Sequence, residues 1–299
     1  MSARHFDYGE AFSRNLGWFS EAEQAKLRDG RVAIAGLGGV GGIHLLTLAR
    51  LGIGHFRIAD FDRFDVANFN RQVGATMTTL DRPKIDVLAE QVLDINPEIE
   101  LDRFPQGVAT GNMDAFLDGA DVYVDGLDFF AFAARRATFA ACHKKGIPAV
   151  TAAPLGMGTG LLVFVPGGMS FEDYFQLEGC DETEMALRFL VGLAPAGLHR
   201  PYLVEPSRID LARRKGPSTM IACNLCAGVA AAETIKLLLG RGEVRPAPWG
   251  LQFDAYRQKT VRTWRPGGNG NPLQRLILAI GRRQLLRQMR QQQNGDARP

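Results

Sequence analysis

The chain has 299 residues, of which 46% are hydrophobic and 22% are charged, and its formal net charge is +3. This length suits one large buried core, or a core with an appendage. No apolar run reaches the ~18 residues that a membrane helix needs, and the first residues lack the apolar core of a secretory signal. We therefore expect a cytoplasmic protein without a transmembrane segment. The net charge is too small to favour nucleic acid as a general partner, and much of it comes from the C-terminal tail.

The first informative segment is a glycine-rich turn. A helical run over residues 20–28 precedes a short, apolar, β-rich run at 31–36, and helical spacing follows at 44–51. Glycines in such a turn let the backbone approach a nucleotide, and the positive end of the next helix then faces the phosphates. The segment predicts a phosphate cradle between a strand and a helix. Its glycines are Gly36, Gly38, Gly39 and Gly41.

A second strand over residues 56–59 ends at Asp60, which lies 24 positions after Gly36. A carboxylate at this spacing can accept hydrogen bonds from a ribose. Asp62 follows in the same segment and joins the predicted nucleotide-binding set. Up to this point the pattern fits any dinucleotide-binding enzyme of the Rossmann type.

Further polar residues change the interpretation. Asn68, Arg71 and Lys84 follow the second strand, and Asp128 follows a later strand at residues 121–125. Nicotinamide-dependent dehydrogenases have no need of this set. Cations beside a phosphate cradle, with a carboxylate to hold a metal, suit the stabilisation of charge on a reacting triphosphate. We therefore predict a site for ATP and magnesium.

This set of residues resembles the ThiF/MoeB/HesA superfamily, the bacterial relatives of ubiquitin-activating enzymes. The resemblance covers about residues 7–165 and resumes over 216–262. It implies an α/β fold with a Rossmann-like mixed sheet and helices on both faces, the sheet becoming antiparallel near residues 161–165. It also implies Mg-ATP-dependent adenylation of a carboxylate with release of pyrophosphate. The implied substrate is most often the C-terminus of a ubiquitin-like or sulfur-carrier protein, while peptides and modified tRNA nucleosides serve among relatives.

The resemblance also implies individual roles. The family's glycine-loop residue, ribose carboxylate, three phosphate-contacting residues and magnesium aspartate fall at Gly39, Asp60, Asn68, Arg71, Lys84 and Asp128. The family places a further arginine in an N-terminal helix that reaches into the partner subunit's site, and here Arg14 matches it. We therefore expect a homodimer with shared active sites. The alternative for Arg14 is a solvated surface side chain.

The implied organisation is an N-terminal helical arm over residues 1–30, an adenylation domain over 31–266 and a basic tail over 267–299. Within the domain, a crossover insert spans about 167–216, and it either covers the bound substrate or is a small helical insert for oligomer contacts. A helix over 220–239 is apolar around most of its surface, so we expect it to be buried. Residues 250–256 and 260–264 resemble the closing strand pair.

The tail predicts a basic amphipathic helix over residues 272–293, interrupted at Gly281. Its apolar positions alternate with arginines. Such helices most often dock on their own domain or on a partner. An anionic membrane surface and an RNA are the alternatives.

The chain has four cysteines. Many relatives bind a structural zinc through two Cys-x-x-Cys pairs, but only Cys223 and Cys226 have that spacing, so we expect these two to pack in a helix without zinc. Cys180 is the cysteine placed to form a thioester, yet its acidic neighbours raise a thiol pKa and weaken the nucleophile. Two other functions stay open: an NAD(P)-dependent oxidoreductase, and a non-catalytic partner subunit of the same fold.

Overall fold

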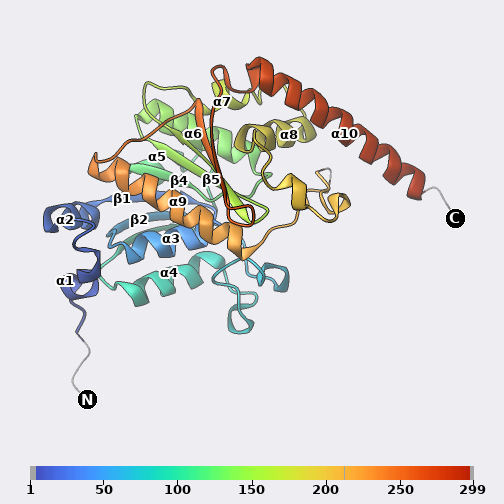
Figure 1. Ribbon diagram of the computed structural model, residues 1–299. Helices are drawn as coiled ribbons and strands as arrows, with labels where there is room; N and C mark the ends of the chain where they lie inside the picture. Colours follow the sequence, from blue (N-terminus) through green and yellow to red (C-terminus); the bar gives the residue numbers. More distant parts are fainter. Residues whose placement is uncertain (1–4, 212, 297–299) are drawn as a thin grey trace.

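The computed structural model describes residues 5–211 and 213–296, with the side chains of the last helix described as far as Leu285 (Figure 1). One sheet of eight strands runs through the molecule in the order β3-β2-β1-β4-β5-β6-β7-β8. β1 to β5 are parallel, and β6, β7 and β8 continue the sheet in antiparallel pairs. The mixed sheet expected from the resemblance is confirmed. The strands are β1 (Arg31–Ala35), β2 (His55–Ala59), β3 (Glu100–Phe104), β4 (Val122–Asp125), β5 (Ala149–Leu155), β6 (Gly158–Phe164), β7 (Trp249–Asp254) and β8 (Lys259–Trp264).

Helices cover both faces of the sheet (Figure 1). One face packs against α2, α3, α4 and α9, and the other against α5 to α8. The α-helices are α1 (Tyr8–Ala11), α2 (Glu21–Asp29), α3 (Gly41–Arg50), α4 (Lys84–Ile95), α5 (Met113–Leu117), α6 (Phe132–Lys145), α7 (Phe171–Phe175), α8 (Glu182–Leu193), α9 (Met220–Leu239) and α10 (Pro272–Asp296). The 3₁₀ helices are η1 (Ser13–Asn15), η2 (Val66–Asn68), η3 (Met77–Thr79), η4 (Arg200–Tyr202), η5 (Pro206–Arg208) and η6 (Gly268–Gly270).

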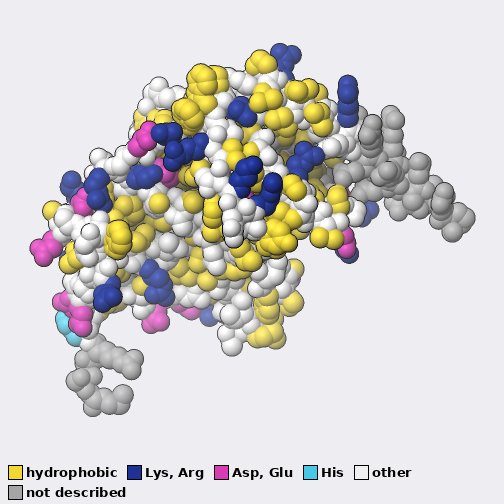
Figure 2. Space-filling model, viewed as in Figure 1, with side chains coloured by type: hydrophobic (Ala, Val, Ile, Leu, Met, Phe, Trp, Pro, Cys, Tyr) yellow, Lys and Arg dark blue, Asp and Glu magenta, His cyan; other side chains and the backbone are white. Residues whose placement is uncertain are grey.

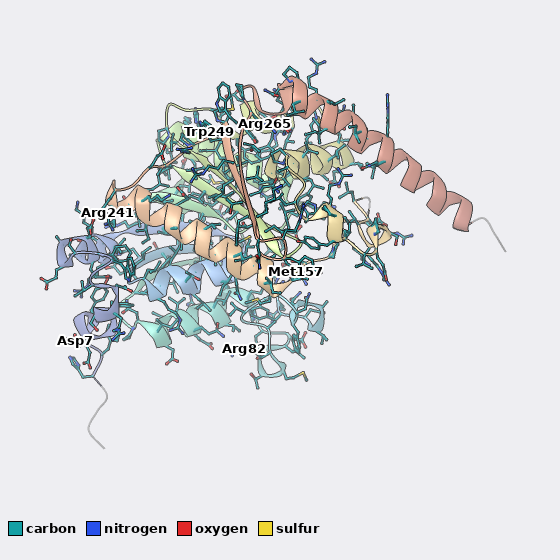
Figure 3. All side chains as sticks on the ribbon, viewed as in Figure 1. Asp7, Arg82, Met157, Arg241, Trp249 and Arg265 are labelled. Carbon is teal, nitrogen blue, oxygen red and sulfur yellow. The ribbon has the colours of Figure 1, made fainter. Side chains whose placement is uncertain are left out.

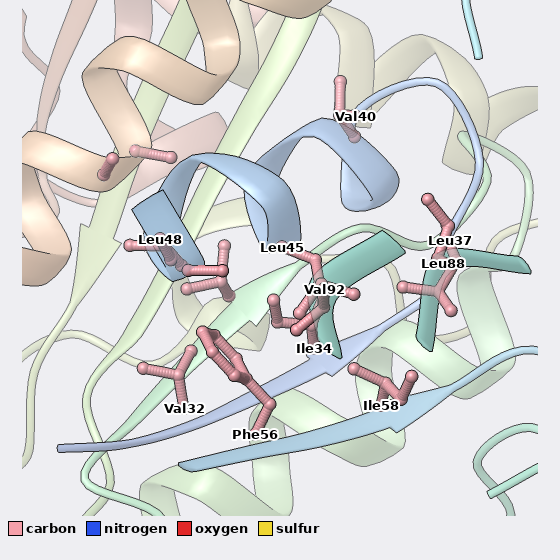
Figure 4. Close-up of a cluster of buried hydrophobic side chains, with 14 of the residues drawn as sticks. Val32, Ile34, Leu37, Val40, Leu45, Leu48, Phe56, Ile58, Leu88 and Val92 are labelled. Carbon is pink, nitrogen blue, oxygen red and sulfur yellow. The ribbon is translucent and has the colours of Figure 1, made fainter. Parts of the chain in front are cut away.

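The alternation of side chains along β1 shows how this sequence builds two cores. Val32 and Ile34 point to one face and pack with α3 and α4, as Figure 4 shows. Ala33 and Ala35 point to the other face, where aromatic side chains such as Tyr123 fill the space that small alanines leave. Successive side chains of a strand alternate in this way, and a parallel strand covered on both faces is apolar throughout. The predicted apolar run at residues 31–36 is therefore a central strand.

The crossover insert is part of the second core. Ser170 and Asp181 cap its two helices, α7 and α8, by accepting backbone N–H bonds from the third helical residue of each. Phe171, Phe175 and Phe189 of these helices are at most 4% exposed and lie in the same aromatic cluster as Phe164 of β6. The insert is thus anchored on the sheet through a shared aromatic cluster, although its sequence periodicity is weak.

The tail helix α10 docks on the domain through its first turns. Gln274 and Leu278 are at most 2% exposed against α8, and Arg282 forms an ion pair with Glu184. This confirms docking on the chain's own domain for the part with described side chains. The predicted interruption at Gly281 is wrong, because α10 continues through it. A Cβ at Gly281 would lie 2.8 Å from Leu187, so this glycine lets α10 approach α8 closely.

Helix α9 has the predicted bounds and ends at Gly240, which adopts the left-handed conformation. Its Cys226 and Ala230 face is buried as expected, while Ile221 on the other side is 50% exposed. Within the described residues, α9 is the helix long and apolar enough to cross a membrane by length and composition. Its packing against β5, β6 and α3 identifies it as a core helix.

Candidate nucleotide-binding site

The glycine turn between β1 and α3 is built by two close backbone approaches. Gly36 has a φ of +81°, and a Cβ there would overlap the carbonyl group of Gly126 after β4. A Cβ at Gly41 would overlap the carbonyl oxygen of Gly36. Both positions therefore require glycine. The segment after β4 is thereby pressed against the turn.

On the outer side of the same turn, Gly38 leaves open space, whereas Gly39 is crowded by a neighbouring sulfur. The nearest atom to a Cβ at Gly38 would be 3.8 Å away, and at Gly39 it would be the sulfur of Cys223 at 3.2 Å. The helix N-cap, Val40, provides no side-chain hydrogen bond to the first amides of α3. Uncapped amides at the start of a ten-residue helix favour an anion. The start of α3 therefore lacks a side-chain cap at the position where we predicted the phosphates.

Asp60, at the end of β2, links that strand to the glycine turn. Its Oδ2 accepts the Leu37 amide at 2.6 Å and its Oδ1 accepts the Asp62 amide at 2.7 Å. Burial raises the pKa of the Asp60 carboxyl, while the two backbone hydrogen bonds and the nearby Lys84 lower it. Each carboxylate oxygen has a second lone pair, so the group retains capacity to accept a ribose hydroxyl.

Lys84 lies at the start of α4 and its side chain is 6% exposed. Its Nζ lies 3.0 Å from Oδ2 of Asp62, whose side chain is 53% exposed. An ammonium group has three N–H donors, and this pair uses one of them. The sequence placed both residues in the site, and the structure joins them as an ion pair.

Arg71 lies across the glycine turn, with its Cγ 3.6 Å from where a Gly39 Cβ would stand. Its Nη1 donates to the Ala67 carbonyl at 2.9 Å and to Oδ1 of Asn70 at 3.0 Å. Asn68, in contrast, uses its Oδ1 to accept the Asp65 amide at 3.0 Å, so the same residue that we predicted to meet the phosphates also closes a local cap. Its amide N–H₂ group is a donor that this cap does not use.

Asp128 is exposed and stands two residues beyond Gly126, whose backbone is pressed against the glycine turn. Its Oδ1 accepts the Phe130 amide at 2.9 Å. The remaining lone pairs fit a magnesium ion, which commonly takes one or two carboxylates and completes its shell with phosphate oxygens and water. The described residues contain no cluster of three or more His, Cys, Asp or Glu side chains suited to a metal. A magnesium ion here would depend on the triphosphate for further ligands.

A buried ion pair that the sequence did not reveal fixes the position of Asp128. Arg135 of α6 donates through Nε to Asp125 Oδ2 at 2.8 Å, and the two side chains are 3% and 2% exposed. Its other nitrogens donate to the carbonyl groups of Leu127 at 2.7 Å, Asp128 at 3.0 Å and Phe129 at 3.2 Å. The Thr151 hydroxyl completes the shell of Asp125 at 2.9 Å. The only sequence signal was an arginine among the apolar positions of a helix.

Arg14 is exposed and does not meet the other predicted residues in its own chain. The N-terminal arm is held at the far end of α3, where Tyr8 donates to the Gly52 carbonyl at 2.5 Å and Asn15 to the Leu51 carbonyl at 3.3 Å. The glycine turn is at the other end of this helix, about 15 Å away for ten residues. In Figure 3 the arm, marked by Asp7, lies far from Met157 and Arg82 at the nucleotide end of the sheet.

The four cysteines are free. Cys223 and Cys226 are buried, as predicted, but Cys223 also touches the glycine turn, and the Cys226 thiol donates to the Thr159 hydroxyl at 3.2 Å. The pKa of the Cys180 thiol is raised by burial first, and further by Glu184 and Asp181 against the lowering effect of Arg188. The direction agrees with the prediction, whereas its main cause was not foreseen.

Comparison with known proteins tests the resemblance to the ThiF/MoeB/HesA superfamily independently of the structure. Residues 12–275 match the profile described as the ThiF family. The sulfur carrier protein ThiS adenylyltransferase of Escherichia coli (strain K12) is 36% identical over 143 residues, which is 48% of this chain and 56% of that protein. The tRNA threonylcarbamoyladenosine dehydratase of Bacillus subtilis (strain 168) is 32% identical over 141 residues, 47% of this chain and 55% of that protein. The chain thus spans about half the length of the curated relatives it matches.

Solved structures share the fold. A crystal structure of E. coli MccB with ATP has a TM-score of 0.64 and 20% identity, covering 85% of this chain and 70% of that one. A crystal structure of PaaA has a TM-score of 0.66 and 16% identity, covering 88% and 75%. Because the family profile extends over most of the chain, the chain belongs to the ThiF family.

Proposed function

We propose that this protein uses Mg-ATP to adenylate a substrate carboxylate and releases pyrophosphate. The observation that carries the proposal is the set of groups gathered around the glycine turn: Arg71 lies beside Gly39, Lys84 pairs with Asp62 next to Asp60, and Asp128 follows the Gly126 segment that is pressed against Gly36. The relatives support the nucleotide, since one is named an adenylyltransferase and another was solved with ATP.

ATP would lie across the carboxyl ends of the strands. Its phosphates would rest over the turn of residues 36–41 and its ribose on Asp60, with Asp62 holding Lys84 in place and Asn68 beside the phosphates. Asp128 would hold the magnesium ion, which supplies positive charge to the triphosphate oxygens when it is bound. An ionised Asp60 has no proton to donate, so it would bind a ribose hydroxyl as an acceptor. It would use the lone pairs that the Leu37 and Asp62 amides leave free.

The reaction brings two anions together. A carboxylate oxygen of the substrate forms a bond to the α-phosphorus, and the bond to the bridging oxygen of pyrophosphate breaks. Arg71 and Lys84 cancel the repulsion and stabilise the charge that develops on the leaving group. The nucleophile is already ionised at neutral pH, so no general base is needed.

For the acyl substrate we propose the C-terminus of a ubiquitin-like or sulfur-carrier protein. The name of the ThiS adenylyltransferase supplies a sulfur carrier protein as a precedent, and MccB was solved with MccA. A modified tRNA is the competing class, since another relative is named a tRNA dehydratase. Purification of the protein from its native cell, followed by identification of the adenylated species, separates these classes.

We further propose a homodimer in which Arg14 completes the partner's site, because in its own chain it lies at the wrong end of α3. Mixing Arg14→Ala with Asp128→Ala tests this. Neither variant alone should be active, whereas random pairing leaves one intact site in each mixed dimer and about a quarter of wild-type activity. No recovery after verified subunit exchange would show that Arg14 acts within its own chain or not at all.

Calorimetry with Mg-ATP, NAD and NADP separates the adenylation proposal from an oxidoreductase. We expect Mg-ATP to bind and the nicotinamide cofactors not to bind. With a carboxylate substrate, exchange of labelled pyrophosphate into ATP should appear, and it should fall at least ~100-fold in Asp128→Ala. ATP binding without exchange in the presence of the identified substrate would favour a non-catalytic partner subunit.

A further inference from the structure

Gln72 places a buried amide beside the open part of the glycine turn. The side chain is 7% exposed, and its Nε2 is the atom nearest to the position that a Cβ at Gly38 would take, at 3.8 Å. Gly38 itself is partly exposed, and Figure 4 shows this turn between Leu37 and Val40. The Gln72 amide therefore borders the open space at Gly38.

The side chain of Gln72 has no hydrogen-bond partner among the residues that the structure describes, and its Oε1 is buried. Its backbone, in contrast, is fully used. Its N–H donates to the Asn68 carbonyl at 2.9 Å, and its carbonyl accepts the Ala75 amide at 3.0 Å. The backbone thus holds the residue in place while the side-chain amide is unpaired. Buried polar groups are rarely without a partner, and each exception calls for an explanation.

Gln24 shows what a buried glutamine with a structural role does in the same chain. It is 6% exposed. Its Nε2 donates to the Tyr8 hydroxyl and to the Leu51 carbonyl, both at 3.0 Å, and its Oε1 accepts the Asn15 side-chain amide at 3.2 Å. Gln72 is buried to a similar extent and makes no such contact with the described residues. Internal hydrogen bonding therefore does not account for its amide.

The residue before Gln72 faces the same turn. The Cγ and Cδ of Arg71 lie 3.6 and 3.7 Å from where a Gly39 Cβ would stand. Two consecutive side chains, one charged and one neutral, thus lie against two consecutive glycines. A glutamine amide nitrogen has two N–H donors, and the oxygens of a phosphate accept such donors. The pair therefore suits an anion that rests on the turn.

We propose that Nε2 of Gln72 donates a hydrogen bond to a phosphate oxygen of ATP over Gly38, beside the charge of Arg71. The proposal rests on the function proposed above and deepens it. A hydrogen bond to a charged group is stronger than one between neutral groups. Because the described residues offer this amide no competing acceptor, the nucleotide takes it without breaking an internal hydrogen bond.

Gln72→Met tests this assignment, because methionine keeps the length of the side chain without its amide. Mg-ATP binding, measured by calorimetry, should weaken about 10-fold or more, the loss typical of a hydrogen bond to a charged group. The midpoint of urea unfolding without nucleotide should stay at or above the wild-type value, because the variant removes a buried polar group that has no partner.

Gln91→Met is the matched control. The Oε1 of Gln91 is also buried without a partner among the described residues, but Gln91 lies on α4 about 10 Å along the helix from Lys84. Its unfolding midpoint should likewise not fall. Its Mg-ATP affinity should stay within about twofold of the wild type, because this side chain does not border the glycine turn.

Mg-ATP affinity within about twofold of the wild type in Gln72→Met would overturn the assignment. Weaker binding accompanied by a lower unfolding midpoint would contradict it as well, since that pattern shows a structural role. If Gln72→Met does not fold, Gln72→Asn withdraws the amide by one methylene and should still weaken Mg-ATP binding; unchanged binding there counts against the proposal. A wild-type protein that binds no Mg-ATP would instead refute the proposed function itself.

Discussion

Replacing Arg135 with methionine removes one partner of a buried ion pair and keeps most of the side chain's apolar length. Arg135 and Asp125 are 3% and 2% exposed, so Asp125 would be left as an uncompensated charge in the core. Removing one partner of such a pair typically costs about 3–5 kcal/mol. Three backbone carbonyl groups, those of Leu127, Asp128 and Phe129, would also lose their donor.

Urea unfolding of Arg135→Met should therefore show a free energy of unfolding lower by about 3–5 kcal/mol. The double variant Arg135→Met/Asp125→Asn should recover part of this loss, because the buried charge is gone. Mg-ATP affinity should stay low in the double variant, since the segment carrying Asp128 still lacks its three hydrogen bonds. A loss below about 1 kcal/mol in the single variant, or full Mg-ATP affinity in the double variant, would refute this reasoning.

Three further predictions follow from single positions. Gly36→Ala should lower the free energy of unfolding by at least about 2 kcal/mol and abolish nucleotide binding. Gly38→Ala should keep the free energy of unfolding within about 0.5 kcal/mol of the wild type and still weaken Mg-ATP binding. Urea unfolding and calorimetry measure the two effects. Burial lowers the pKa of His44 to about 4, so its unfolded state binds more protons below pH ~6.5. Stability should therefore fall by about 3 kcal/mol as the pH drops from about 6.5 to 4, and His44→Leu should lack this dependence in acid titrations of unfolding. Cys180→Ala should keep pyrophosphate exchange near wild type, while any reductant-sensitive thioester to the enzyme should disappear.

The parts of the fold that the sequence predicted are those governed by local rules. The glycine turn, the strand before it and the helix after it follow from the backbone freedom of glycine and from short-range periodicity. Helix α9 ends at Leu239, where Gly240 adopts the left-handed conformation, and its bounds were predicted from the same local signals.

The parts that it did not predict depend on contacts between distant residues. Gly281 looked like a helix breaker, because sequence cannot show that Leu187 lies against it. Cys223 looked like a core residue alone, since nothing in the helix pattern places its sulfur beside Gly39. The sequence did not show whether Arg135 is buried or exposed. An arginine is rarely buried without a paired carboxylate, and its partner Asp125 lies on a different element, the strand β4.

The C-terminal part of the chain, from the β7–β8 turn through the tail, is strongly basic. Between Asp254 and Asp296 the sequence contains nine Lys and Arg residues and no Asp or Glu. Figure 2 shows Lys and Arg side chains spread over the face that carries the C-terminal strands, with apolar side chains between them. One of these arginines, Arg282, forms an ion pair with Glu184 of α8. At this position the charge therefore helps to dock α10 on the domain.

A chain of hydrogen bonds joins the nucleotide half of the site to the crossover. Asn70, which binds Arg71, donates to the Ser218 carbonyl at 2.9 Å, and the next hydroxyl, on Thr219, donates to the Gly156 carbonyl at 3.0 Å. The adjacent turn residue Met157 donates to the Tyr202 hydroxyl at 2.7 Å, which in turn donates to Asp254 at 2.6 Å. Because these bonds run from Asn70, the neighbour of Arg71, to Tyr202 of the insert, a displacement at either end would disturb the same set of contacts. That connection is the physical reason to expect the crossover to respond when a nucleotide binds.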